Sequence, residues 1–318
     1  MRPRLALLGA QDPLGEAVIA LLEERELELA ELIPLALDDS EDVISYAGDD
    51  LMPESAEGFD WSRADVLVVA ARGPAARRQA EAAARLGLPV ICLEAEPGLG
   101  ADTLHRVDSG LAVAAARALG AVARHAGLAS VDIFAALPVS MAGKSGVEEL
   151  ARQTQSVFAM EDVDSETFPV RIAFNLIPQV GLPLEDGANE LERCAIADLR
   201  AALGMPGLPL LLTASWVPTF YGCALTIHGM TRQDMTRSQL RTCLEGVDDL
   251  ILMDETVTGG APTPATESQE SETVFAGRLR VDQADGRHFA LWLVCDANRL
   301  EAAQIVDRIE NMIEKKAK

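Results

Sequence analysis

The stretch between Ala129 and Leu150 holds the residue types and spacing most suggestive of ligand chemistry. A β-prone run, Val131–Phe134, leads into a loop with two glycines and then into a helix-like run that begins at Val147. A strand, a glycine loop and a helix in this order present backbone N–H groups to an anion. Gly143-Lys144-Ser145 also matches the end of a phosphate-binding P-loop, but the glycine required five residues earlier is Pro138. The spacing argues against a P-loop and favours a strand-to-helix connection whose glycines only permit a turn.

A second glycine-containing turn lies near the N-terminus. Arg4–Leu8 is a short apolar run, Leu14–Glu24 has apolar residues at helical spacing, and Leu27–Leu37 is again β-prone. A βαβ unit with a glycine-rich first turn is the beginning of a dinucleotide-binding Rossmann domain. The candidate cofactor-binding residues are those of this turn, the acid after the second strand and the second glycine loop: Gly9, Ala10, Asp12, Gly15, Asp38, Ser140 and Gly143.

Two acidic residues bear on whether a dinucleotide binds here. Asp12 stands where the middle glycine is expected, and like charges about 4 Å apart repel by roughly 4 kcal/mol at an effective dielectric of about 20. The alternative, which we favour, is that Asp12 caps the helix with Pro13 at its first position. Asp38 follows the second strand, where an acid binds a ribose 2′-hydroxyl and repels a 2′-phosphate. The sequence therefore favours NAD over NADP, although a solvated acidic loop explains Asp38 equally well.

These residues must be positioned by a doubly wound domain at the N-terminus. Further β-prone runs at 65–71 and 89–93 alternate with alanine-rich helical patterns at 75–86 and 111–125. Strands that alternate with helices indicate a parallel sheet covered on both faces. We therefore predict a Rossmann-like domain over residues 1–128, completed by a C-terminal helix at 298–318.

The pattern changes after residue 150. Helical patterns remain at 188–203 and 237–245, and most of the chain between them is β-prone or irregular. The β-prone runs are Phe168–Leu176, Leu210–Val217, Ala224–Met230, Thr273–Val281 and Phe289–Cys295. Residues 129–297 are therefore expected to form an α+β domain with a mixed sheet. The fold class is α/β in its first domain and α+β in its second.

Composition excludes several classes of function. The 318-residue chain is 49% hydrophobic, which allows a full core, and its net charge of −23 argues against nucleic acid, whose binding needs clustered Lys and Arg. Five scattered cysteines without a Cys-x-x-Cys pair give no spacing for a metal and indicate reduced thiols in a cytoplasmic protein. The apolar run at the N-terminus is too short for a signal peptide, and no run is long enough for a membrane helix.

Several segments together carry a family resemblance. Ser140–Leu150 resembles the SGAGKAGVEEL stretch of aspartate-semialdehyde dehydrogenases, Phe174–Gly181 is similar to their FNxIPxIG, and Val217–Gly222 resembles their RVPVxxGH. Further matches lie at Ala261–Pro264, Val274–Arg280, and Asp296 with Ala302-Ala303. The segments keep the family's order over nearly the whole chain. The resemblance implies a Rossmann domain interrupted by a dimerising α+β domain, and hence a homodimer.

The catalytic residues that the resemblance implies are replaced in this chain. The nucleophilic cysteine falls at Gly110, after Ser109; the acid/base histidine at Cys223; and the substrate-binding arginine at Trp216. A lysine that helps to bind phosphate falls near Cys194. Glycine cannot attack an aldehyde, and loss of a nucleophile alone costs about 10⁶-fold in turnover. The remaining weak candidates for catalysis are Ser109, Cys194 and Glu192.

The chain is most similar in this respect to the Usg-type homologues, which keep the fold and lack the active cysteine. We expect a homologue without dehydrogenase activity, with NAD or NADP bound weakly or not at all. Two alternatives stay open: an oxidoreductase with a changed substrate and a rebuilt site, and an assembly partner of an active homologue. Cys194 and Cys223 both fall at family active-site positions, which would allow them to lie close together. Small apolar packing is the favoured role for both, and a redox pair or a displaced nucleophile is the alternative. The sequence names no small-molecule ligand.

Overall fold

The computed structural model describes residues 2–37, 42–93 and 103–317, and these form two compact units. Unit 1 comprises residues 1–108 and 301–318, and unit 2 comprises residues 109–300. The boundaries therefore differ from the expected 128/129 and 297/298. Helix α3 (Gly110–Ala126) accounts for the first difference, because its buried alanines and leucines join the core of unit 2.

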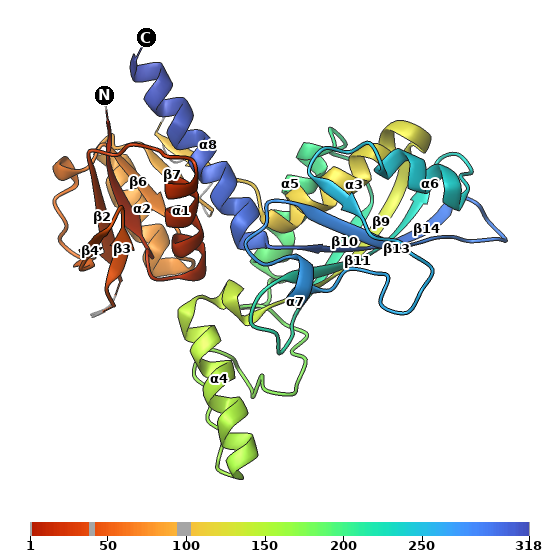
Figure 1. The fold of residues 1–318 in the computed structure, drawn as a ribbon, viewed down its shortest axis with the longest axis horizontal. Coiled ribbons are helices and arrows are strands. Elements are labelled where there is room, and N and C mark those ends of the chain that lie inside the picture. Colours follow the sequence, from red (N-terminus) through yellow and green to blue (C-terminus); the bar gives the residue numbers. More distant parts are fainter. Residues whose placement is uncertain (1, 38–41, 94–102, 318) are drawn as a thin grey trace. The chain divides into compact units, whose positions relative to one another are not determined.

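Unit 1 is a doubly wound parallel sheet, as predicted (Figure 1). Its strand order is β5-β2-β1-β6-β7-β8, and every neighbouring pair is parallel. The strands are β1 (Arg4–Leu8), β2 (Glu31–Ala36), β5 (Glu54–Ser55), β6 (Val66–Val69), β7 (Val90–Cys92) and β8 (Leu104–Arg106). The order runs outward in both directions from β1 and β6, so the strand order reverses between them, as in dinucleotide-binding folds.

Helices cover both faces of this sheet. Helix α1 (Pro13–Glu24) and residues 301–313 of α8 (Ala297–Ala317) share one hydrophobic core with Leu5 and Leu7. Helix α2 (Pro74–Arg85) packs on the other face through its buried alanines. Alternate residues of β1 thus enter two cores, which explains why the strand is apolar throughout. The sequence did not predict the hairpin of β3 (Ile44–Tyr46) and β4 (Asp49–Leu51).

Unit 2 is built on a mixed sheet, which confirms the predicted fold class. Its order is β10-β9-β11-β14-β13-β12, with β9–β10 and β12–β13 parallel and the other pairs antiparallel. The strands are β9 (Leu128–Leu137), β10 (Leu210–Trp216), β11 (Cys223–Thr231), β12 (Leu250–Leu252), β13 (Val274–Val281) and β14 (His288–Cys295). Because β9 alternates between buried residues such as Ile133 and exposed ones such as Phe134, only one sheet face is fully covered.

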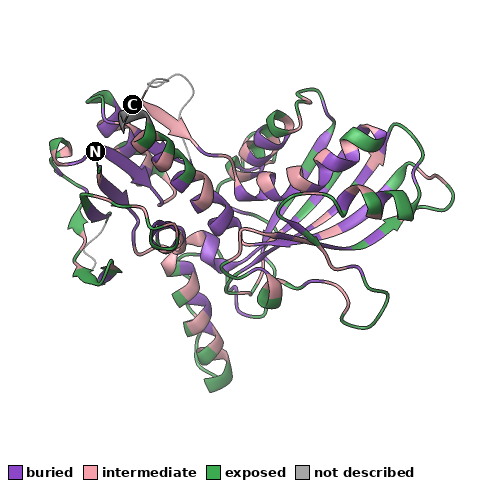
Figure 2. Cartoon of the chain, turned by 45° about the horizontal axis from the view of Figure 1, so that its top comes forward, coloured by how far each residue is buried: buried purple, intermediate pink, exposed green. Residues whose placement is uncertain are grey.

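Three helices cover that face, namely α3, α5 (Glu190–Ala202) and α6 (Arg237–Leu244). They turn buried residues toward the sheet and exposed ones outward (Figure 2). On the opposite face the strand register places Leu211 beside Asp132 and Asp132 beside His228, and all three are exposed. We call the residues on this side of the sheet the open face.

Helix α4 (Lys144–Ala159) extends away from this sheet, and the following segment runs back beside it (Figure 1). The strand predicted at Phe168–Leu176 is wrong, because this segment is irregular. Its backbone donors are taken by a side chain: the N–H groups of Ile172 and Ala173 donate to Oε1 of buried Gln153 at 2.9 and 3.1 Å. Gln153 is fixed in turn by a 2.8 Å hydrogen bond to Oε1 of Glu149. Donors satisfied in this way need no strand partner.

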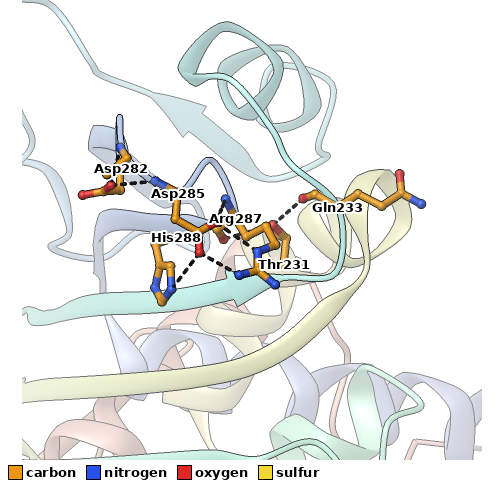
Figure 3. Close-up of polar contacts among 7 residues, drawn as sticks. Thr231, Gln233, Asp282, Asp285, Arg287 and His288 are labelled. Atoms are coloured by element: carbon orange, nitrogen blue, oxygen red, sulfur yellow. Dashed lines mark hydrogen bonds and ion pairs between the residues drawn. The ribbon is translucent and has the colours of Figure 1, made fainter.

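The turn between β13 and β14 is held by two aspartates (Figure 3). The Asp282 carboxylate accepts hydrogen bonds from the N–H groups of Ala284 and Asp285 at 2.7 and 3.0 Å. The Asp285 carboxylate accepts a 2.7 Å hydrogen bond from Nη2 of Arg287 and lies 3.7 Å from Nε2 of His288. The Arg287 side chain is the main reason that the pKa of Asp285 is lowered to about 2.

Candidate functional site

Gly9 and Gly15 shape the turn that follows β1. Gly9 has φ +81°, and a Cβ there would lie 2.9 Å from Cβ of Ala71, the second residue after β6. A Cβ at Gly15 would lie 2.7 Å from Cα of buried Ala10 and would overlap the Gly9 carbonyl oxygen. Both glycines are therefore required by packing within unit 1. The turn lies at the reversal of strand order, where open α/β sheets bind their ligands.

Asp12 places a carboxylate in this turn. Its backbone occupies the N-cap position of α1, with φ −80° and ψ 153° and with Pro13 next, as predicted. The predicted side-chain cap is wrong, since the carboxylate makes no capping hydrogen bond to the helix. Oδ2 instead points to Gly9, 3.0 Å from the place of a Cβ there. The charge thus stays in the turn that would face a pyrophosphate. Asp38, the expected ribose ligand, lies outside the described residues.

The loop between β9 and α4 uses its backbone donors internally. The N–H groups of Val139 and Ser140 donate to the carbonyl oxygens of Thr219 and Phe220 at 2.9 and 3.1 Å. The N–H of Gly143 donates to the Ser140 carbonyl at 3.1 Å, and Gly143 supplies the φ of +87° from which α4 begins. These three N–H groups are therefore taken within the protein, and Gly143 supplies the turn from which α4 begins.

Gly110 is the first residue of α3 and is buried against the start of α8. A Cβ at this position would lie 2.8 Å from Cα of Ala297 and would overlap the Ala297 carbonyl oxygen. The preceding Ser109 donates its backbone N–H to Asp198 at 2.9 Å, and its side chain makes no capping hydrogen bond. A thiol therefore has no room at position 110 without movement of the backbone that faces it.

Trp216 ends β10 in an apolar setting. Its ring packs edge-to-face on Phe168, with centroids 5.4 Å apart and an interplanar angle of 73°. Its backbone exchanges two hydrogen bonds with Ile177, at 2.9 and 3.0 Å. The position expected for a substrate-binding guanidinium is thus filled by an aromatic pair, in surroundings where an unpaired charge would be costly.

Cys223 begins β11 and is 1% exposed. It pairs across the sheet with Cys295, the last residue of β14, and its thiol donates to Sδ of Met141 at 3.3 Å. The pKa of Cys223 is raised well above its ordinary value, first by a hydrogen bond with the Cys295 thiol and then by burial. A buried, protonated thiol is a poor nucleophile and no substitute for an imidazole.

Cys295 and Met141 were not among the residues that the sequence singled out. The expected partner of Cys223 was Cys194, which lies half-buried on α5. No local signal could have found the observed pairing, because Cys223 and Cys295 are 72 positions apart and meet only through the register of β11 and β14. The structure thus brings Cys223 together with a cysteine from the neighbouring strand.

Glu192, a weak catalytic candidate, has both carboxylate oxygens engaged. One accepts the Asn189 N–H at 3.0 Å, while the Asn189 side chain accepts the Glu192 N–H at 2.9 Å, which completes a capping box at the start of α5. The other accepts the N–H of Ala214 in β10 at 2.8 Å. Glu192 therefore ties α5 to the sheet.

Within residues 2–37, 42–93 and 103–317, no three His, Cys, Asp or Glu side chains are grouped so as to hold a metal ion. Over the same residues, no helix combines the length and the apolar character that crossing a membrane requires.

A Rossmann-like unit joined to a mixed-sheet unit is the architecture of a semialdehyde dehydrogenase, and comparison with known proteins supports this. The family described as "Semialdehyde dehydrogenase, dimerisation domain" matches residues 119–299, and the chain belongs to that family. The predicted resemblance is thereby confirmed.

Relatives extend the similarity to the whole chain. A USG-1 protein homolog of Pseudomonas aeruginosa is 29% identical, with 94% of each chain covered. Aspartate-semialdehyde dehydrogenase 2 of Vibrio cholerae is 27% identical over 97% of each chain. The crystal structure of aspartate semialdehyde dehydrogenase II from Vibrio cholerae, complexed with ASA, superimposes with a TM-score of 0.86 at 25% identity and 99% coverage of both chains.

Proposed function

We propose that this chain is a non-catalytic homologue of aspartate-semialdehyde dehydrogenase that acts through binding or assembly. The observation that carries the proposal is the packing at Gly110. A cysteine at this position would have to displace the backbone of Ala297. The chain therefore lacks the nucleophile and also lacks the space for its side chain. Loss of a nucleophile alone lowers turnover by about 10⁶-fold, or roughly 8 kcal/mol in the barrier.

The surroundings of the other two replaced positions support the same proposal. Trp216 packs edge-to-face on Phe168, and Cys223 is buried against Met141 and Cys295. An indole and a buried thiol therefore stand where the family resemblance implies the arginine and the histidine, and neither carries a positive charge. Aldehyde oxidation needs a thiolate and a proton carrier, and these positions supply neither.

The turn after β1 fits a dinucleotide poorly. Gly9 and Gly15 keep the backbone shape of a pyrophosphate-binding turn, but the Asp12 carboxylate lies in it and would repel the phosphates. We therefore propose that NAD and NADP bind weakly or not at all, and we derive no hydride-transfer step for this chain.

We further propose that the chain forms a homodimer through the open face of unit 2. The matched family is named for dimerisation, and the open face exposes Leu211 and Phe134 beside polar residues. Exposed apolar side chains on a sheet that helices cover on one side only are typical of an interface.

The test uses the purified full-length chain with aspartate semialdehyde, phosphate and either NAD or NADP. We expect no reduction of the dinucleotide, measured at 340 nm, under conditions in which an active relative is measured in parallel. We also expect an unchanged melting temperature with either dinucleotide at millimolar concentration. A ligand at 100 times its Kd adds about 2.7 kcal/mol to the stability of the folded state. Turnover would refute the proposal, and a thermal shift without turnover would favour an oxidoreductase with a changed substrate.

A further inference from the structure

Three sulfur atoms meet in the interior of unit 2. Met141 comes from the short helix at Val139–Ala142, Cys223 from the start of β11 and Cys295 from the end of β14. Sγ of Cys223 lies 3.3 Å from Sδ of Met141, and Cys295 stands directly opposite Cys223 on the neighbouring strand. The three residues are 4%, 1% and 0% exposed, respectively. We call them the sulfur cluster.

The donor set of this cluster is chemically selective. Two thiolates and a thioether are soft ligands, which favour Cu(I). Zn²⁺ requires four nitrogen, sulfur or oxygen ligands. Among the described residues, no third His, Cys, Asp or Glu joins the two cysteines to make such a group. A three-coordinate site in which one ligand is a thioether therefore suits Cu(I) better than Zn²⁺.

We propose that Met141, Cys223 and Cys295 form a buried site for a single Cu(I) ion. Binding forms three Cu–S bonds, and the two thiols release their protons to solvent, so that the ion and its two thiolates carry a net charge of −1. No electron is transferred, because copper enters and stays as Cu(I). The site lies at the position that the family resemblance assigns to the acid/base histidine.

The geometry of the cluster is compatible with such an ion. Sulfur ligands about 2.3 Å from a metal at trigonal angles are roughly 4 Å apart. The Met141–Cys223 separation of 3.3 Å must therefore widen by a fraction of an ångström, and the flexible methionine side chain allows this. Cys295 lies directly opposite Cys223 in the antiparallel register, which keeps the two thiols on the same side of the sheet.

The charge around the cluster is also in keeping with bound thiolates. Helix α8 begins at Ala297, two residues after Cys295. A helix N-terminus stabilises negative charge. Asp296 is the acidic neighbour, and its carboxylate accepts the N–H groups of Arg299 and Glu270, at 3.1 and 3.3 Å.

Titration of the reduced full-length protein with Cu(I) under argon, against a chromophoric Cu(I) chelator, tests the site. We expect about one tightly held Cu(I) per chain, with release of about two protons, and X-ray absorption showing sulfur ligation alone. Cys223→Ser and Cys295→Ser should each weaken binding at least 100-fold, and Met141→Leu about 10-fold. The matched control is Cys194→Ser, which removes a half-buried thiol of α5 and should leave binding unchanged.

Loss of Cu(I) binding is distinguished from misfolding of a variant. Each metal-free variant is first checked for a cooperative thermal transition, and Met141→Leu keeps the volume of the core if a cysteine variant fails to fold. Uptake well below one Cu(I) per chain would overturn the proposal. So would uptake that survives Cys223→Ser and Cys295→Ser but is lost in Cys194→Ser, or oxygen and nitrogen ligation in the absorption spectrum. None of these outcomes bears on whether the chain is a dehydrogenase.

Discussion

At the scale of single residues, the position of the family nucleophile is closed by packing. Gly110 is buried at the start of α3, and the space that its side chain would take is filled by the backbone of Ala297. Glycine is thus the residue that lets α3 and the first turn of α8 approach each other. Restoring a thiol at this point must disturb the core of unit 2 before it can restore any chemistry.

We expect Gly110→Cys to destabilise the protein by about 1–3 kcal/mol without creating dehydrogenase activity, because the new Cβ overlaps Ala297. Urea unfolding and the assay with aspartate semialdehyde and NADP measure the two effects. Ser109→Cys is the matched control, since it adds a thiol at the neighbouring half-buried residue and should leave stability within about 0.5 kcal/mol. Turnover by Gly110→Cys, or stability equal to that of the native chain, would contradict this account.

At the scale of elements, the turn between β13 and β14 shows how local charges set a turn. The folded-state pKa of Asp285 is about 2, against roughly 3.9 in an unfolded chain. A carboxylate with a depressed pKa stabilises the fold above the unfolded value, and the contribution is lost as the pH falls from about 4 toward 2. The turn is therefore expected to loosen in acid.

Arg287→Gln should raise the pKa of Asp285 toward the ordinary value, because the arginine side chain is the largest cause of its depression. The stability difference between the native chain and the variant should be present at pH 7 and should narrow as the pH falls below about 4. Urea unfolding between pH 7 and pH 3 measures it. Arg193→Gln makes the same change of net charge at the exposed ion pair with Asp186 and should show no such narrowing. A stability difference between the native chain and Arg287→Gln that does not depend on pH would refute the assignment of Arg287 as the main cause of the lowered Asp285 pKa.

The sequence predicted most elements because their apolar patterns are local. In unit 1, β6 and β7 are continuous apolar runs and β1 is one after Arg4, and β9 of unit 2 alternates, so these strands could be recognised before folding is considered. Phe168–Leu176 has the composition of a strand, but the side chain of Gln153 takes its backbone donors, and nothing in the nine residues themselves reveals that.

Prediction of the site was limited in the same way. The replacement of the catalytic residues at Gly110, Trp216 and Cys223 was implied by the family resemblance. The sulfur cluster did not, because it depends on the register between β11 and β14 and on a helix from another part of the chain. Side chains brought together by tertiary contacts leave no pattern in the sequence around them.

At the scale of the molecule, net charge and self-association oppose each other. A chain with a net charge of −23 repels its own copies, so a homodimer requires an interface in which apolar contacts outweigh that repulsion. The open face offers such contacts through Leu211 and Phe134. Because salt screens like charges, association of the proposed dimer should strengthen with ionic strength.

Leu211→Glu should shift the proposed dimer toward monomer, raising its Kd by at least tenfold, which corresponds to about 1.4 kcal/mol. The change buries a charge at the interface and adds to the repulsion between copies. Sedimentation velocity over a range of protein concentrations measures the shift. Leu86→Glu is the matched control, because Leu86 in unit 1 is 72% exposed and Leu211 is 70% exposed. An equal shift in the dimer Kd for Leu211→Glu and Leu86→Glu would exclude the open face as the interface.

The contact between Gly15 and the carbonyl of Gly9 limits what mutation can change in this turn. Position 15 is held by its packing on the backbone of Gly9 and Ala10, and position 9 by its positive φ and its contact with Ala71, whatever the turn binds. Only the middle position, where Asp12 stands, is released if a nucleotide no longer has to be accommodated. A lineage that stops using the cofactor would therefore keep the first and third glycines of the turn indefinitely. Loss of cofactor binding would be visible in the sequence only at the middle position.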